Sequence, residues 1–207
     1  MAASVGSALV PDSIGVVGVG RISSAAVRGL YRSSNAQFVL SPRNAAKAQA
    51  LEQEFETVRI ATNNQAVVDA CDCVLLAVLP GQAEQVCEPL QFRQGQLVIS
   101  LMAGVPLSDI EKWCGPAECA LACPLPAIAE NAGTTIVTPP EPRTVAVFEK
   151  LGTAVPVAAW RAVHKSNCRG ASPPVLNHGL HTPSTRRLHD GVAVWSLTDR
   201  FSQHGRA

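Results

Sequence analysis

Short apolar runs alternate with segments whose apolar residues recur every three or four positions, from about residue 13 to residue 157. The runs are typical of buried strands, and the recurring spacing is typical of amphipathic helices. The runs predict strands at Ile14–Val17, Gln37–Leu40, Val58–Ile60, Cys73–Val78, Leu97–Leu101, Glu118–Ala122, Thr135–Val137 and Ala154–Val157. The segments between them predict helices at Ser23–Tyr31, Gln65–Ala70, Gln82–Leu90, Leu107–Trp113 and Arg143–Leu151, and a further helix with Ala48, Leu51 and Phe55 on its apolar face.

Strict alternation of strands and helices predicts an α/β fold with a Rossmann-type, doubly wound, largely parallel sheet, because helices must cover both faces of continuously apolar strands. In such sheets ligands bind beyond the carboxyl ends of the strands. Turns of unusual composition follow four of the predicted strands, at Gly18–Ser23, Ser41–Asn44, Leu79–Gly81 and Ala103–Gly104. We therefore expect these four turns to surround one ligand.

The first of these turns has the chemistry of a dinucleotide site. The sequence Gly18-x-Gly20-x-x-Ser23 follows the strand and opens a helix. Gly18 would make the sharp turn, Gly20 would let phosphates approach the backbone, and the small Ser23 would let the helix pack close to the strand. A chance match to this short pattern is the alternative interpretation.

The end of the second strand favours NADP(H) over NAD(H). An NAD-binding chain usually carries Asp or Glu there to accept a hydrogen bond from the ribose 2′-hydroxyl. Here the sequence reads Leu40-Ser41-Pro42-Arg43-Asn44 and contains no carboxylate. Ser41 and Arg43 would instead hold a 2′-phosphate, Arg43 through charge-assisted hydrogen bonds. The alternative is a solvent-exposed turn with a helix cap.

Composition and charge exclude several function classes. Apolar residues make up 47% of the chain, charged residues 16%, and the net charge is +1. This balance argues against a broad nucleic-acid or membrane surface, and the apolar runs are too short to cross a bilayer. Residues 1–12 lack the features of a signal peptide and are expected to be a disordered leader on a cytoplasmic protein. The 7 cysteines include no Cys-x-x-Cys pair, so we expect them to be reduced.

The amino-acid composition of the chain changes near residue 158. Residues 158–207 are basic, contain all 5 histidines, and keep no apolar face over successive helical turns. One interpretation is a natural basic extension that is disordered or binds a partner. A second is a segment from a shifted reading frame or alternative exon that replaces the domain expected there, and we favour this one. A clustered-histidine metal site is a third, but the histidine spacings are irregular.

Taken together, the motifs resemble the N-terminal domain of pyrroline-5-carboxylate reductases. The resemblance rests on Ile14–Gly20, Arg28–Leu30, Ser41–Asn44, Ala77–Pro80 and Ile99–Gly104, and it runs in order from about residue 13 to residue 157. Members of this family use NAD(P)H to reduce a cyclic imine to proline. The resemblance therefore implies an NADP(H)-binding oxidoreductase of proline biosynthesis that acts on a small imino-acid-like substrate.

The resemblance also implies a set of cofactor contacts. Val19 to Ser23 would contact the pyrophosphate, Ser41 and Arg43 the 2′-phosphate, and Asn64 the adenosine, while Ala77–Pro80 and Met102–Gly104 would lie along the ribose and nicotinamide. The full set of expected cofactor-binding residues is Gly18, Val19, Gly20, Arg21, Ile22, Ser23, Ser41, Arg43, Asn44, Asn64, Ala77, Val78, Leu79, Pro80, Met102, Ala103 and Gly104.

Two departures from the family bear on the substrate. Leu79 stands where the family has lysine, and Cys123-Pro124-Leu125-Pro126 replaces Met-Pro-Asn-Thr-Pro. A divergent, reductase-like branch fits this loop better than an orthodox proline-forming enzyme. Nothing in residues 158–207 resembles the family's helical domain, which forms the dimer and much of the imino-acid site. We therefore expect a truncated chain of doubtful activity that has lost the family's homo-oligomer.

No catalytic or metal-binding residue is predicted. His164 lies in the tail, and Ser100 and Thr134 are best explained by structural roles. The leading hypothesis is an NADP(H)-dependent reductase of the pyrroline-5-carboxylate reductase type. The first alternative is a non-catalytic NADP(H)-binding or regulatory protein, which would bind NADPH without turnover. The second is an enzyme like the hydroxyacid or 6-phosphogluconate dehydrogenases, which would need a catalytic lysine on a helix after the sheet.

Overall fold

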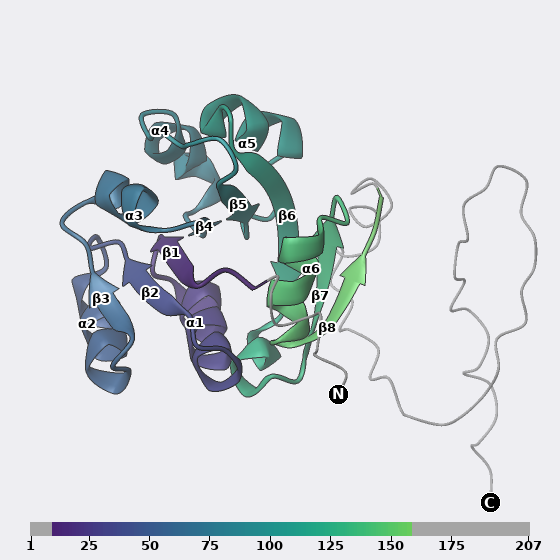
Figure 1. The fold of residues 1–207 in the computed structure, drawn as a ribbon. Coiled ribbons are helices and arrows are strands. Elements are labelled where there is room, and N and C mark those ends of the chain that lie inside the picture. Colours follow the sequence, from purple (N-terminus) through teal and green to yellow (C-terminus); the bar gives the residue numbers. More distant parts are fainter. Residues whose placement is uncertain (1–9, 159–207) are drawn as a thin grey trace, which may run out of the picture. The chain divides into compact units, whose positions relative to one another are not determined.

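The computed structural model describes residues 10–158, and these form one α/β domain (Figure 1). Its strands are β1 (Ser13–Val17), β2 (Gln37–Leu40), β3 (Val58–Ile60), β4 (Cys73–Leu76), β5 (Leu97–Ser100), β6 (Glu118–Pro124), β7 (Gly133–Thr138) and β8 (Gly152–Pro156). Its α-helices are α1 (Arg21–Ser33), α2 (Ala45–Glu54), α3 (Asn64–Ala70), α4 (Ala83–Cys87), α5 (Leu107–Cys114) and α6 (Pro142–Glu149). Two short 3₁₀ helices, η1 (Pro80–Gln82) and η2 (Pro126–Glu130), follow β4 and β6.

The strands form one sheet in the order β3-β2-β1-β4-β5-β6-β7-β8. The first six strands of this order are mutually parallel, as the alternating pattern predicts. The chain reverses after β6, so that β7 runs antiparallel to β6 and β8 runs parallel to β7. The prediction of a Rossmann-type, largely parallel sheet is therefore confirmed, and the strand order changes direction between β1 and β4, where such folds bind their ligands.

Helices cover both faces of the sheet (Figure 1), and each face has its own core. Helices α1, α2 and α6 pack over a cluster that includes the fully buried Leu30, Phe38 and Phe148. Helices α3, α4 and α5 pack over a second cluster on the opposite face, which includes Val67, Leu76 and Ile110. This two-sided burial explains why the central strands are apolar at every position rather than at alternate ones.

Several predicted elements differ from the observed ones. The predicted helix Gln82–Leu90 is only a 3₁₀ turn followed by the short α4, because the first residues after Leu79 take the tighter helix that Pro80 begins. The predicted helix Arg143–Leu151 spans Pro142–Glu149, and Gly152 opens β8, where its φ of +138° and its close approach to Gly133 require glycine.

Residues 10–12 pack against the domain in front of β1. Val10 lies against the core beneath α1, and the carbonyl oxygen of Asp12 accepts a hydrogen bond from the N–H of Gln37 at 2.8 Å. The predicted tail, residues 158–207, falls outside the described residues except for Ala158, and so does His164. In residues 10–158 the structure contains no helix long and apolar enough to span a membrane.

Candidate functional site

The two glycines of the turn after β1, Gly18 and Gly20, serve different purposes. Gly18 has a φ of +97°, and a Cβ added there would lie 2.6 Å from the carbonyl oxygen of Ala77. A glycine is therefore required at position 18, because of the positive φ there and because the segment after β4 approaches closely. At Gly20 an added Cβ would meet only the Ser23 hydroxyl, at 3.9 Å. Nothing in the folded domain fills that space, so it is open to a ligand.

Ser23 stabilises the turn from the first turn of α1. Its hydroxyl donates a hydrogen bond to the Gly18 carbonyl oxygen at 2.8 Å and accepts one from the N–H of Gly20, also at 2.8 Å. The side chain is 1% exposed. The hydroxyl thus fixes the shape of the loop. The first N–H groups of α1, beginning at Arg21, have no partner within the helix and are free to bind an anion.

The turn after β2 is attached directly to the glycine turn. The Ser41 hydroxyl accepts a hydrogen bond from the N–H of Gly18 at 2.9 Å, and the Asn44 side-chain amide donates one to the carbonyl oxygen of Val19 at 3.1 Å. Ser41 is 1% exposed. Because its hydroxyl oxygen accepts this hydrogen bond, the hydroxyl proton remains available as a donor. These two contacts join segments more than twenty residues apart in the sequence and fix their relative position.

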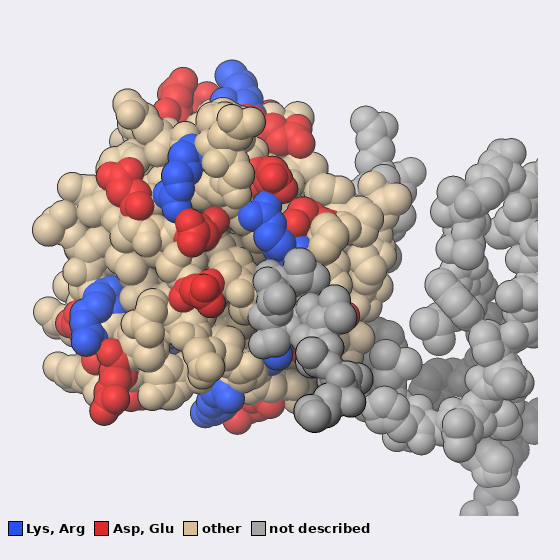
Figure 2. All heavy atoms as spheres, viewed as in Figure 1, with Lys and Arg blue, Asp and Glu red and all other residues tan. Residues whose placement is uncertain are grey.

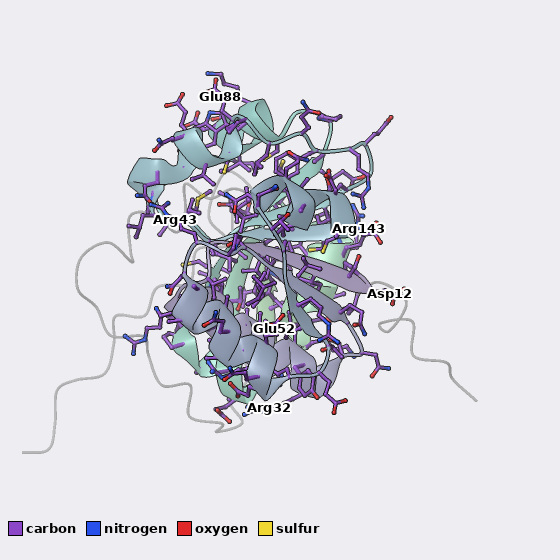
Figure 3. All side chains as sticks on the ribbon, turned by 90° about the vertical axis from the view of Figure 1, so that its left-hand side faces the viewer. Asp12, Arg32, Arg43, Glu52, Glu88 and Arg143 are labelled. Carbon is purple, nitrogen blue, oxygen red and sulfur yellow. The ribbon has the colours of Figure 1, made fainter. Side chains whose placement is uncertain are left out.

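Arg43 links the second turn to the turn after β4. Its side chain is exposed, and its Nη1 donates a hydrogen bond to Oε1 of Gln82 at 3.1 Å. Figure 3 shows Arg43 on the opposite side of the molecule from Asp12 and Arg143, which lie near the amino ends of the strands. Gln82 was not predicted as a site residue, although its place in the turn after β4 was a usable signal.

The remaining predicted residues also lie at the carboxyl edge of the sheet. Asn64 is the first residue of α3, and residues 61–63 connect it to the carboxyl end of β3. Ala77 to Pro80 follow β4, and the Ala77 N–H donates to the carbonyl oxygen of Val17 at 2.8 Å. In the turn after β5, Met102 is buried whereas Ala103 and Gly104 are exposed. The fold thus brings together, at one edge, all the segments that the sequence pattern assigned to one ligand.

Ser100 and Cys71 have structural surroundings. The Ser100 hydroxyl is 1% exposed and accepts a hydrogen bond from the Met102 N–H at 3.3 Å. Burial raises the pKa of the Cys71 thiol to about 11, so this thiol stays protonated and unreactive at neutral pH. Among residues 10–158, no three His, Cys, Asp or Glu side chains are placed to hold a metal ion.

A hollow lies at the opposite, amino edge of the sheet. It has a volume of about 420 Å³ and is lined by the segment before β1, the end of α1 and Lys150. Asp12, Arg32 and Lys150 give it charges of both signs. It contains none of the residues expected to bind a nucleotide. The glycine turn and the groups attached to it mark the opposite edge as the candidate site.

Part of the chain is similar to known oxidoreductases. Residues 13–104 match the family model described as NADP oxidoreductase, coenzyme F420-dependent. The pyrroline-5-carboxylate reductase of Pseudomonas aeruginosa is 30% identical over 114 residues, which are 53% of this chain and 41% of that protein. The chain thus spans less than half the length of this relative.

Solved structures show the same likeness. A pyrroline-5-carboxylate reductase from Coxiella burnetii matches with a TM-score of 0.65 and 25% identity, over 75% of this chain and 62% of that chain. An imine reductase from Myxococcus stipitatus in complex with NADP⁺ matches with a TM-score of 0.58 and 19% identity, over 70% of this chain and 54% of that chain. The second match shows a shared fold alone. The predicted resemblance is confirmed: residues 13–104 match an NADP oxidoreductase family model, and the chain is similar to pyrroline-5-carboxylate reductases.

Proposed function

We propose that this chain binds NADP(H) at the carboxyl edge of its sheet and belongs to a reductase that acts on a carbon–nitrogen double bond. The main support is the assembly of Gly18, Ser41 and Asn44 into one hydrogen-bonded unit, with Arg43 beside it and no carboxylate at the end of β2. The family match and the resemblance to pyrroline-5-carboxylate reductases support the reaction class.

The residues present fit the phosphate groups of the cofactor. The open space at Gly20 and the free N–H groups at the start of α1 suit the pyrophosphate. Arg43, with the remaining proton of the Ser41 hydroxyl, would hold the 2′-phosphate. Arg43 would exchange its hydrogen bond to the neutral Gln82 for a stronger one to a charged phosphate.

The rest of the edge would hold the reacting end of the cofactor. NADPH, when bound, supplies the hydride that reduces the double bond. Ala77 to Pro80 and Met102 to Gly104 would orient the ribose and nicotinamide and exclude water from them. No residue between 10 and 158 is assigned as a proton donor. The resemblance makes pyrroline-5-carboxylate the first imine to assay, and the departures at Leu79 and Cys123–Pro126 favour a related imine.

A non-catalytic NADP(H)-binding protein is the second candidate. The observation that favours it is the composition of the turns after β4 and β5, because residues 77–81 and 101–106 contain no acidic, basic or hydroxyl side chain.

Calorimetric titration of the full chain with NADPH and with NADH tests the proposal. A charge-assisted contact contributes about 1.5–3 kcal/mol, so we expect NADPH to bind at least about tenfold more tightly than NADH. Arg43→Ala should abolish that preference. The matched control Arg32→Ala, which removes the same charge from the far end of α1, should preserve it.

Addition of pyrroline-5-carboxylate, followed by the absorbance of the reduced cofactor, then separates the two candidates. Turnover supports the reductase, and saturable NADPH binding without turnover supports the non-catalytic protein. Absence of binding for both nucleotides would contradict the proposal.

A further inference from the structure

The candidate site is chemically divided into a basic half and a neutral half. Arg21 and Arg43 stand beyond β1 and β2, where the phosphates would lie. Beyond β4, β5 and β6 the chain runs through residues 77–83, 101–107 and 123–129, and none of these segments contains a charged residue. By contrast, charged side chains of both signs are interspersed over the face shown in Figure 2. The neutral half therefore differs from that face in having no charged residue in its three segments.

Large apolar side chains are exposed in two of these neutral segments. Leu79 is 69% exposed and Leu125 is 40% exposed. They follow the carboxyl ends of β4 and β6, the strands on either side of β5. The hydroxyl of Ser100, at the end of β5, is buried and already accepts a hydrogen bond from the Met102 N–H. The side chains that these segments offer to a ligand are thus almost wholly apolar.

Leu79 lies within the nucleotide site rather than beside it. Two residues before it, Ala77 forms a hydrogen bond to Val17 and approaches Gly18 closely. Three residues after it, Gln82 accepts the hydrogen bond from Arg43. A molecule bound on the apolar surface beside Leu79 would therefore lie next to the bound nucleotide, as hydride transfer to a substrate requires.

We propose that the neutral half of the site takes an uncharged imine with an apolar body, and that Leu79 and Leu125 set this preference. The inference rests on the proposed function. A substrate carboxylate here would lose water without gaining a cationic partner, which is unfavourable. An apolar body would instead cover the two leucines and remove their surface from water, which is favourable.

The test measures ternary binding and does not require turnover. The full chain is saturated with NADP⁺ and titrated with 2-phenyl-1-pyrroline, which is uncharged, and with pyrroline-5-carboxylate. We expect the uncharged probe to bind at least tenfold more tightly. Leu125→Lys, at the exposed leucine that is not among the expected cofactor contacts, should shift the ratio of the two dissociation constants at least tenfold toward the carboxylate and leave NADP⁺ affinity within a factor of three.

Val155→Lys is the matched control. Val155 is also an exposed apolar side chain, at 38%, but it lies on the edge strand β8, separated from β6 by β7. This variant should leave the ratio unchanged. Thermal melting of both variants verifies that each is folded.

Three results would overturn the inference. In the first, pyrroline-5-carboxylate binds as tightly as the uncharged probe. In the second, neither probe binds the NADP⁺ complex; the nucleotide part of the proposed function then still stands. In the third, Leu125→Lys dissociates an oligomer without changing the ratio, which means that the apolar surface binds protein. Failure of NADP⁺ to bind would instead contradict the proposed function itself, and this inference with it.

Discussion

Substitution of Gly18 should lower the stability of the fold, whereas substitution of Gly20 should weaken nucleotide binding. In Gly18→Ala the new Cβ would lie 2.6 Å from the carbonyl oxygen of Ala77 and 2.9 Å from Cγ1 of Val78, in a residue with a φ of +97°. Backbone strain of this kind costs about 1–3 kcal/mol, and insertion of a methyl group into filled space costs a similar amount. We therefore expect the free energy of unfolding to fall by about 2–6 kcal/mol.

Gly20→Ala is the matched control, because its Cβ would meet only the Ser23 hydroxyl at 3.9 Å. Its free energy of unfolding should change by less than about 1 kcal/mol, while its affinity for NADPH falls at least about tenfold. Urea denaturation followed by circular dichroism measures the first quantity, and calorimetry measures the second. Equal stability of the two variants would refute the reasoning about Gly18. Undiminished NADPH binding by Gly20→Ala would refute the assignment of the open space to phosphate.

Two further predictions concern the opposite side of the domain. Burial opposes ionisation of Glu141, but hydrogen bonds from the Thr144 hydroxyl and from the first N–H groups of α6 outweigh it and hold its pKa below the ordinary value. Glu141→Ala should therefore cost about 1–2 kcal/mol at pH 7. Because the folded pKa lies below the unfolded one, this difference should shrink as the pH falls below about 4 in urea denaturation, and a difference that persists at pH 2 would contradict it. Asn131 has a φ of +54° and donates to the carbonyl oxygens of Gly29, at 2.9 Å, and Lys150, at 2.6 Å. Asn131→Ala should cost about 2–4 kcal/mol and Asn131→Gly about 1 kcal/mol less, and equal thermal denaturation midpoints for the two variants would contradict the backbone contribution.

The parallel part of the fold could be predicted because its signal is local. Each central strand is a continuous apolar run, and each turn at its carboxyl end has an unusual composition that can be recognised without knowledge of the partner strands. The reversal at β7 could not be predicted in the same way. Its direction depends on how the chain returns through η2, where Asn131 takes a left-handed conformation.

The same limit applies to the site. The sequence pattern identified Ser41 and Ser23 as small polar residues near a ligand, but it did not show that their hydroxyl groups also bond to Gly18 and so stabilise the loop itself. Hydrogen bonds between residues distant in sequence, such as the one from Asn44 to Val19, cannot be predicted from the spacing of apolar and polar residues. The division into a basic half and a neutral half was visible only once the strand order had placed the turns side by side.

The most direct test of the account is to locate the bound nucleotide. In a titration of the isotope-labelled full chain with NADPH, followed by the backbone amide signals, the account predicts the largest shifts at Gly20 to Ser23 and at Arg43 and Asn44. Shifts that map instead to the hollow at the amino edge, around Ser33 to Ala36 and Lys150, would contradict it.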